Sequence, residues 1–279
     1  MTAFPFPVDK HAFKTVGGQT LSLLTLPGLR PDAPLLYVVH GGGWDSGEAS
    51  ELFCYAPLTR LLREHGWAMA SVEYRFAHTP EGYRFDEMFD DILDGLEWLA
   101  ARRAAFQFDP QRVVALGTSA GGHLALMTGL AGRTFRPSLP VEIRLVIDCC
   151  GPADLLDFGS LEGEDFAYYR SVIEPLAGAP PIAQQAAVYR RISPIQYVTP
   201  QSPPLFMIHG TADTIVPFGH SVRMAERCLA LGVPHCLMPL THAWHNMELS
   251  KLPGLSPRPE RDVALRCAAQ WALACTGES

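Results

Sequence analysis

Residues 113–121 read Val-Val-Ala-Leu-Gly-Thr-Ser-Ala-Gly, a short run of β-forming residues that ends in the pattern Gly-x-Ser-x-Gly. A helical pattern follows at 120–130, so the motif lies between a predicted strand and a predicted helix. In that setting the glycines let the chain turn sharply and raise the serine hydroxyl at the head of the helix. The stretch therefore predicts an α/β fold with Ser119 as an exposed nucleophile, beside a helix N-terminus that favours developing negative charge.

Short β-rich apolar runs recur along the whole chain and end in glycine or turn residues, and longer amphipathic stretches separate them. The predicted strands are 35–40, 68–74, 113–116, 145–148, 205–209 and 235–238, and the predicted helices are 49–65, 85–103, 120–130, 218–231 and 259–274. This alternation predicts a mostly parallel sheet covered by helices on both faces. Two earlier runs, around Phe13 and at 21–26, predict an antiparallel hairpin at its edge, which makes eight strands.

Residues 1–279 are expected to form one domain, since α/β folds often reach this length as a single unit. Residues 153–200 break the alternation, with helical pieces at 166–176 and 182–191 and many prolines and glycines. We expect this segment to be a cap-like insertion over the carboxyl ends of the strands, where open α/β sheets bind ligands.

The composition excludes several classes of protein. A chain with 48% hydrophobic and 18% charged residues is neither disordered, collagenous nor a coiled coil. The 22 Lys and Arg against 29 Asp and Glu lack the basic excess that nucleic-acid binding needs. The apolar runs are too short to span a membrane, and no signal peptide is readable. Seven scattered cysteines without a C-x-x-C pattern predict free thiols and a cytoplasmic location.

Residues 40–44 read His-Gly-Gly-Gly-Trp and follow the first predicted parallel strand. Three successive glycines leave backbone N–H groups unobstructed, and acyl transfer needs such donors for its tetrahedral oxyanion. A flexible turn is the alternative interpretation. It is less favoured because the glycines lie at the carboxyl end of the strand expected beside that of Ser119.

A serine nucleophile needs a base and an orienting acid, which follow the late strands of a doubly wound hydrolase in the order Ser, Asp, His. Asp213 comes after the strand at 205–209 and fits the acid. The last strand is followed by Thr-His-Ala-Trp-His at 241–245, so both His242 and His245 are candidates for the base. His242 is favoured because it lies closer to the strand end.

The remaining histidines give no metal site by pattern. His235, His242 and His245 lack a third ligand at helical spacing and a Glu-x-x-His motif, so neither a metal nor an organic cofactor is expected. His40 and His209, both at strand ends, are expected to be scaffold histidines.

Together these motifs resemble those of α/β-hydrolase superfamily serine esterases, in the group of hormone-sensitive-lipase-like, feruloyl-esterase-like and animal-type kynurenine-formamidase-like enzymes. Further similar features are Val72-Glu73-Tyr74-Arg75, the helix at 91–98, Phe108-Asp109-Pro110, Ser193-Pro194 and the His-Gly-x-x-Asp-x-x-Val-Pro run at 209–217. The resemblance implies the α/β-hydrolase fold. The short segment before Phe13 has no counterpart of the long N-terminal cap of hormone-sensitive-lipase-like esterases.

The resemblance also implies roles for individual residues. It makes Ser119 the nucleophile, Asp213 the orienting acid and His242 the base, with an oxyanion hole formed by the amides of Gly42, Gly43 and Ala120. Thr-His-Ala-Trp at 241–244 is similar to the Thr-His-Ala-Phe of formamidase-like members, which favours His242 over His245.

These features predict a serine hydrolase that cleaves carboxylic esters of small or medium acyl groups through an acyl-enzyme, with a small-molecule ester or amide as its partner. Arylformamidase activity is the alternative, and a non-catalytic ligand-binding protein is disfavoured because all three triad members are present. The substrate pocket is expected to include Trp44, Phe76, Ile215 and Trp244. The sequence leaves the natural substrate and the oligomeric state open, a dimer being allowed.

Overall fold

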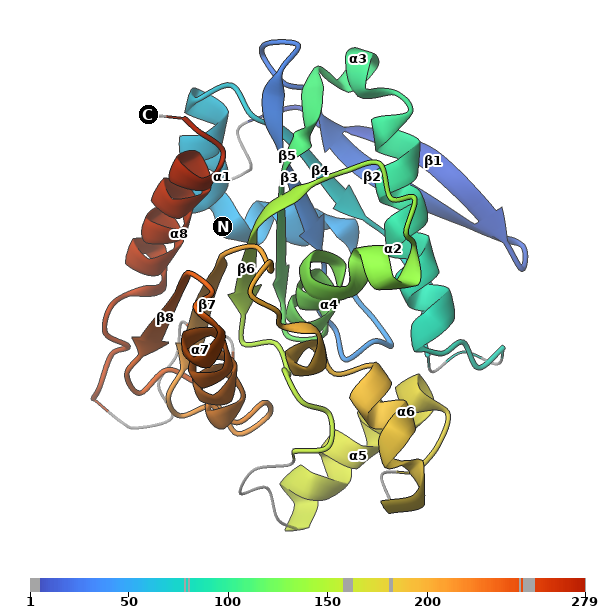
Figure 1. The fold of residues 1–279 in the computed structure, drawn as a ribbon, viewed down its shortest axis with the longest axis vertical. Coiled ribbons are helices and arrows are strands. Elements are labelled where there is room, and N and C mark those ends of the chain that lie inside the picture. The colour runs from blue at the N-terminus through green and yellow to red at the C-terminus, as the bar shows by residue number, and fades with distance from the viewer. Residues whose placement is uncertain are drawn as a thin grey trace.

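The computed structural model describes residues 6–77, 79, 81–157, 163–180, 183–245, 247 and 254–278, except for the side chains of 164–166 and 183. Within these residues eight strands form one sheet in the order β1-β2-β4-β3-β5-β6-β7-β8 (Figure 1). The strands are β1 Asp9–Val16, β2 Gln19–Leu26, β3 Ala33–Val39, β4 Ala68–Val72, β5 Phe108–Thr118, β6 Ile143–Cys149, β7 Leu205–Gly210 and β8 His235–Leu240.

The pairing directions confirm the predicted sheet. β1 and β2 form an antiparallel hairpin at one edge, and β2 also pairs antiparallel with β4. From β4 to β8 all neighbours are parallel. The carboxyl ends of β3 and β5 to β8 therefore meet at one edge of the sheet, where such folds place their ligands.

Helices cover both faces of the sheet, with α1 and α8 on one face and α2, α4 and α7 on the other (Figure 1). The α-helices are α1 Ala56–Glu64, α2 Phe85–Ala100, α3 Arg103–Phe106, α4 Ala120–Phe135, α5 Gly163–Ala177, α6 Ala186–Arg191, α7 Gly219–Leu231 and α8 Arg261–Cys275, and the 3-10 helices are η1 Ala49–Tyr55, η2 Ala183–Gln185 and η3 Pro194–Tyr197. The helix predicted at 49–65 is divided into η1 and α1. Pro57 lies in the first turn of α1, where its missing N–H costs no hydrogen bond.

The central strand β3 packs against helices on both faces of the sheet. All seven of its residues are buried. Leu35, Tyr37 and Val39 pack in the core with α2, whereas Leu36 and Val38 pack in the core with α1 and α8. A strand covered on both faces needs apolar residues at every position, which explains its unbroken apolar run.

A buried ion pair joins α2 to the end of β4. The carboxylate of Asp91 is fully buried and accepts hydrogen bonds from Arg75 Nε at 2.7 Å and Nη2 at 2.9 Å. Lys14 Nζ of β1 approaches Asp91 Oδ1 at 2.6 Å. The two features noted at 72–75 and 91–98 are thus partners in one interaction.

Asp148 is a second buried carboxyl group, near the end of β6, whose Oδ1 accepts the Gly151 N–H at 2.9 Å. The space for it depends on glycine, because a Cβ at Gly122 or Gly151 would lie 2.4 or 2.5 Å from that oxygen. Burial raises the pKa of Asp148 to about 7, although the hydrogen bond from Gly151 opposes this shift.

We expect the stability of Asp148→Asn relative to wild type to be greater at pH 8 than at pH 5. An unfolded Asp releases its proton near pH 4, whereas folded Asp148 keeps it up to about pH 7. The free energy of unfolding of the wild type therefore falls as pH rises through this window, by about 1–3 kcal/mol between pH 5 and 8.

Urea unfolding at the two pH values measures this difference, with Asp9→Asn, an exposed position on β1, as the matched control. A stability difference between wild type and Asp148→Asn that is the same at both pH values would contradict the expectation.

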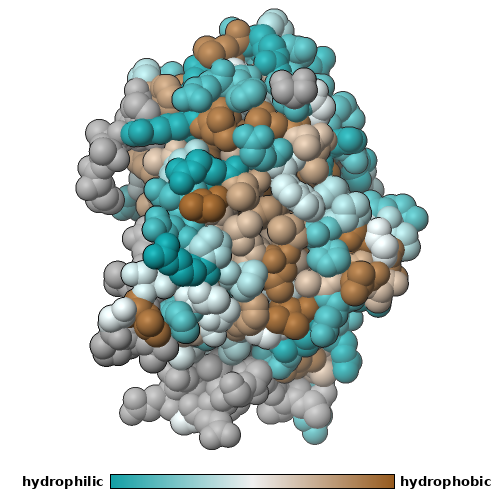
Figure 2. Space-filling model, turned by 90° about the vertical axis from the view of Figure 1, so that its left-hand side faces the viewer, coloured by the Kyte–Doolittle hydropathy of each residue, from teal (hydrophilic) through white to brown (hydrophobic). Residues whose placement is uncertain are grey.

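The surface mixes hydrophilic and hydrophobic residues. Figure 2 shows the side of α1 and α8, where hydrophobic residues form a band down the middle between hydrophilic margins. Among the described side chains, the large hydrophobic ones that are exposed are Leu29, Tyr168, Leu229, Leu255 and Val263. Among the described residues, no helix combines the length and the apolar character needed to cross a bilayer.

Candidate active site

Ser119 lies at the sharp turn between β5 and α4 and has φ 55° and ψ −121°, a conformation that non-glycine residues rarely adopt. The flanking glycines are sterically required. A Cβ at Gly117 would lie 2.2 Å from the carbonyl oxygen of Gly121, and one at Gly121 would lie 2.1 Å from that of Val39. The predicted strand, turn and helix around the serine are confirmed.

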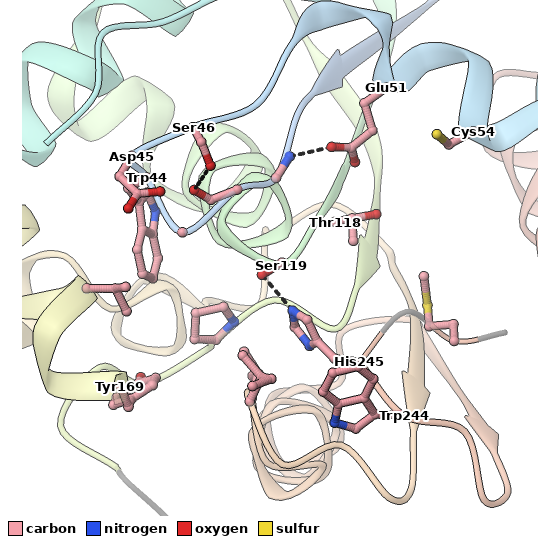
Figure 3. Close-up of a pocket in the computed structure, with 18 of the residues that line it drawn as sticks. Trp44, Asp45, Ser46, Glu51, Cys54, Thr118, Ser119, Tyr169, Trp244 and His245 are labelled. Atoms are coloured by element: carbon pink, nitrogen blue, oxygen red, sulfur yellow. Dashed lines mark hydrogen bonds between the residues drawn. The ribbon is translucent and has the colours of Figure 1, made fainter. Parts of the chain in front are cut away.

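The Ser119 hydroxyl is hydrogen-bonded to His245 (Figure 3). His245 is in turn hydrogen-bonded to Asp213. Nε2 of the imidazole lies 2.9 Å from Ser119 Oγ, and Nδ1 lies 2.7 Å from Asp213 Oδ2. Because an ionised carboxylate only accepts hydrogen bonds, Nδ1 carries the ring proton and donates a hydrogen bond to Asp213. Nε2 is then free to accept the serine proton.

The sequence favoured His242 over His245 as the base, but the structure places His245 against Ser119, and the turn after β8 explains why. His242 has φ 65°, and its N–H donates to Thr211 Oγ1 at 3.0 Å. The carbonyl oxygen of the next residue, Ala243, accepts the N–H of Ala212 at 3.0 Å. These bonds keep the first part of the loop against the end of β7, so the chain reaches Ser119 only at His245.

Asp213 is held as a carboxylate by donors on both of its oxygens. Oδ1 accepts the N–H groups of Ile215 at 2.9 Å and Val216 at 3.0 Å. Oδ2 lies 3.2 Å from His209 Nε2 as well as 2.7 Å from His245 Nδ1. Burial alone would raise the pKa of Asp213, but the hydrogen bonds from the two histidines and their electrostatic attraction outweigh burial and hold this pKa well below its ordinary value.

His209 is more than the scaffold histidine expected from the sequence. Its Nε2–H faces the carbonyl oxygen of Val216 at 2.9 Å as well as Asp213, and its Nδ1 accepts the hydroxyl of Ser221 at 2.8 Å. These contacts fix the ring beside the carboxylate. The spacing His-Gly-x-x-Asp, in which the two residues are four apart, was the available signal for this pairing.

The glycine loop after β3 curls beside the serine. Gly42 has φ 114° and Gly43 has φ 60°, and a Cβ at Gly42 would lie 2.2 Å from the carbonyl oxygen of Ser46. The carbonyl of Gly42 accepts the Ser46 hydroxyl at 3.0 Å, which closes the curl (Figure 3). Gly42 and Gly43 line the same pocket as Ser119, and Ala120 begins the helix that follows the serine. The oxyanion role of these three amides stays a prediction.

A cavity of about 670 Å³ opens over Ser119, with a lining that is mostly apolar and aromatic. Trp44, Ile215 and Trp244 line it, as predicted. Phe76 is the exception, because its ring stands edge-on to those of His40 and Tyr74, at centroid distances of 5.9 and 5.7 Å. This ring cluster holds Phe76 against the core rather than in the pocket.

Helix α5 of the predicted insertion forms one wall of the cavity through Tyr168, Tyr169 and Val172. Tyr169 is almost fully buried, whereas Tyr168 is half exposed. Residues 158–162 and 181–182 of the predicted insertion lie outside the described residues.

His123 connects the pocket wall to the segment after α6, a role that the sequence did not indicate. The Trp44 indole N–H donates to His123 Nδ1 at 3.3 Å, and His123 Nε2–H donates to the carbonyl oxygen of Ile192 at 2.7 Å. Burial lowers the pKa of His123 to about 4, although the Ile192 bond opposes this. The ring is therefore neutral and joins Trp44 to α4. Its position four residues after Ser119 was the available signal.

Among the described residues, the side chains grouped closely enough to hold a metal ion are Cys150, Asp213 and His245, with their ligand atoms within 4.8 Å of one another. Two of these belong to the serine arrangement, where each has a hydrogen-bond partner. Burial raises the pKa of the Cys150 thiol well above its ordinary value, which disfavours the thiolate that a metal requires. The donor set does not fit a resident metal.

Comparison with known proteins identifies the family. The BD-FAE family model matches residues 24–228, so the chain belongs to this family. Its fold is that of the α/β-hydrolases. Its structure is similar to that of the thermophilic esterase Est2 of Thermogutta terrifontis, with a TM-score of 0.75 and 22% sequence identity. The alignment covers 98% of this chain and 93% of the Est2 chain.

Among curated proteins, esterase LipC of Mycobacterium tuberculosis is 30% identical over 205 residues, which are 71% of this chain and 49% of LipC. Ethyl acetate hydrolase of Pseudomonas putida is 35% identical over 135 residues, 46% of this chain and 40% of that protein. The chain spans about half the length of the first curated relatives that it matches.

The geometry predicts which histidine activates the serine. An organophosphonate labels a serine only where a base accepts its proton, so His245→Ala should slow the labelling of Ser119 by at least about 100-fold. His242→Ala, the matched control, should leave the rate within about threefold, because the His242 contact given above is made by its backbone. Mass spectrometry of the labelled peptide over time measures both rates. Faster labelling in His245→Ala than in His242→Ala would contradict the assignment.

Proposed function

We propose that this protein is a serine hydrolase that cleaves carboxylic esters of small or medium acyl groups through an acyl-enzyme. The observation that carries the proposal is the continuous chain of hydrogen bonds from Ser119 through His245 to Asp213, at the head of α4 and beside a glycine loop. Nucleophile, base and orienting acid are thus within reach of one another. The esterase names of the relatives support the same chemistry.

In the acylation half-reaction, Ser119 Oγ attacks the ester carbonyl carbon while its proton passes to His245 Nε2. The resulting tetrahedral intermediate collapses when Nε2 returns the proton to the leaving alkoxide, which departs as an alcohol. Asp213 accepts from Nδ1 throughout, so it keeps the imidazole in the productive tautomer and stabilises the imidazolium that forms transiently.

In the deacylation half-reaction, water takes the place of the alcohol. His245 Nε2 accepts a proton from the water as it attacks the acyl carbonyl and then returns a proton to Ser119 Oγ. The carboxylic acid leaves, and the free serine is restored. The same two nitrogen positions thus serve both halves of the reaction.

The charge that develops on the carbonyl oxygen in both intermediates needs preorganised donors. We assign these to the N–H groups of Gly42, Gly43 and Ala120, of which the last also benefits from the positive end of α4. Removal of one such donor in a serine hydrolase costs about 10²–10³ in kcat.

The pocket supports a substrate of modest size. Val172 of α5 lies near the glycine loop, since a Cβ at Gly43 would be 3.7 Å from its Cγ1. With Tyr169 it closes one side of the cavity of about 670 Å³. We assign residues 153–200 as a cap-like insertion in a single domain that limits the acyl group, and the name of ethyl acetate hydrolase is consistent with a small acyl group.

Other predictions about the protein remain as the sequence made them. The relatives compared above are named for ester hydrolysis, so they lend no support to the arylformamidase alternative. All seven cysteines are free thiols, which supports the proposal of a cytoplasmic location. A small-molecule substrate as the partner and the absence of a cofactor stay predictions.

A panel of p-nitrophenyl acetate, butyrate and octanoate beside N-formylkynurenine tests this function. We expect the acetate and butyrate to be cleaved with the highest kcat/KM, and Ser119→Ala to lower kcat on them by about 10⁴-fold or more. Ser256→Ala, at an exposed position, is the matched control and should retain full activity. Retention of ester hydrolysis by Ser119→Ala, or faster cleavage of N-formylkynurenine than of every ester, would refute the proposal.

A further inference from the structure

Glu51 is an acidic side chain of the pocket that the proposed reaction does not use. It projects from η1, and its Oε2 accepts the backbone N–H of Gly41 at 2.6 Å (Figure 3). Gly41 directly precedes Gly42 and Gly43, the two glycines to which we assign oxyanion donors. The carboxylate therefore restrains the loop at the residue next to those donors.

The other oxygen of Glu51 is connected by hydrogen bonds to the turn that holds Ser119. The Tyr55 hydroxyl donates to Glu51 Oε1 at 2.6 Å and is also hydrogen-bonded to Thr118 Oγ1. Tyr55 is fully buried, and Thr118 is the residue immediately before Ser119. A chain of hydrogen bonds thus runs from Gly41 through Glu51 and Tyr55 to Thr118.

The glycine loop and the serine turn touch each other but are not joined by their own backbones. A Cβ at Gly41 would lie 2.8 Å from the carbonyl oxygen of Thr118 and 3.6 Å from Ser119 Cβ. Within the described residues, no backbone hydrogen bond links 41–43 to 118–120. The polar connection between the two loops is therefore made by the side chains of Glu51 and Tyr55.

We propose that Glu51 and Tyr55 are positioning residues that hold the Gly42 and Gly43 amides in register with Ser119. The inference rests on the proposed ester hydrolysis and adds the means by which its oxyanion donors are kept in place. An oxyanion hole acts through preorganisation, so a loop that must reorder during the reaction loses transition-state stabilisation while substrate binding is little changed.

Both carboxyl oxygens of Glu51 have hydrogen-bond partners. Burial raises the pKa of Glu51 above its ordinary value, although the hydrogen bonds from Tyr55, Gly41 and Thr118 and the nearby charge of Arg261 oppose this shift. The Arg261 guanidinium carbon lies 6.0 Å from the centroid of the Tyr55 ring. A glutamine can also make the two hydrogen bonds to Gly41 and Tyr55, because its amide N–H₂ can face the Tyr55 oxygen while its carbonyl accepts from Gly41.

The test compares Glu51→Ala, which loses the hydrogen bonds, with Glu51→Gln, which loses only the charge. We expect Glu51→Ala to lower kcat for p-nitrophenyl acetate by about 10–100-fold with KM within about threefold. A trifluoromethyl ketone, which forms a tetrahedral adduct with the serine, should lose affinity by the same factor as kcat. Glu51→Gln should retain kcat within about threefold because it restores both hydrogen bonds.

Tyr55→Phe tests whether the two side chains act as one unit. It removes the hydroxyl and keeps the buried ring, so its defect should be smaller than that of Glu51→Ala, and the double variant should be no worse than Glu51→Ala alone. Glu48→Ala, at an exposed position of the same segment, is the matched control and should behave as wild type.

The rates of wild type and of the Glu51, Tyr55 and Glu48 variants are expressed per active site after titration with an organophosphonate, so a misfolded fraction does not count as a loss of kcat. The rate of Ser119→Ala, which has no serine to titrate, is expressed per mole of folded protein. Wild-type kcat in Glu51→Ala, or a fall in kcat without a matching loss of ketone affinity, would overturn the positioning role. A defect in Glu51→Gln as large as that in Glu51→Ala would also overturn it. Ser119→Ala in the same assay tests the underlying hydrolase function separately, because its retention of activity would refute that function whatever the Glu51 variants do.

Discussion

The close approach of α4 to the end of β3 is the constraint on which the site depends. Gly121 is so near the carbonyl oxygens of Val39 and His40 that a Cβ would lie 2.1 and 2.5 Å from them. This contact sets the first turn of α4 against the strand that leads into the glycine loop. Ser119, two residues before Gly121, is thereby brought beside Gly41. The close packing of Gly117 and Gly121 on either side of Ser119 maintains its strained φ of 55°.

The carboxyl groups near the site differ in pKa because they differ in their hydrogen-bond donors. Asp213 accepts four hydrogen bonds and remains ionised, which lets it orient His245. Asp148 accepts one backbone hydrogen bond at full burial, and its pKa is about 7. Glu51 lies between these cases, with donors on both oxygens at the pocket edge. The number of donors, rather than burial alone, decides which acid carries charge near the serine.

Most of the fold and the turn that holds Ser119 could be predicted from local pattern, because the alternation of strands and helices and the Gly-x-Ser-x-Gly motif depend on neighbouring residues. The choice between His242 and His245 could not be predicted, since it depends on hydrogen bonds that the loop makes with Thr211 and Ala212, about thirty residues away in the chain. Phe76 was misassigned for a similar reason, because its contact with His40 forms only when β3 and β4 pair. The periodicity of a sequence does not predict contacts between segments that are far apart in the chain.

The central claim is that Ser119 forms a covalent acyl intermediate during ester cleavage. Intact-protein mass spectrometry of the wild type, quenched in acid within the first turnover of p-nitrophenyl butyrate, measures this directly. We expect a single added butyryl mass, located on the peptide that contains Ser119 and absent from Ser119→Ala. Release of p-nitrophenol in that turnover with no adduct, or with an adduct on a different residue, would contradict the mechanism.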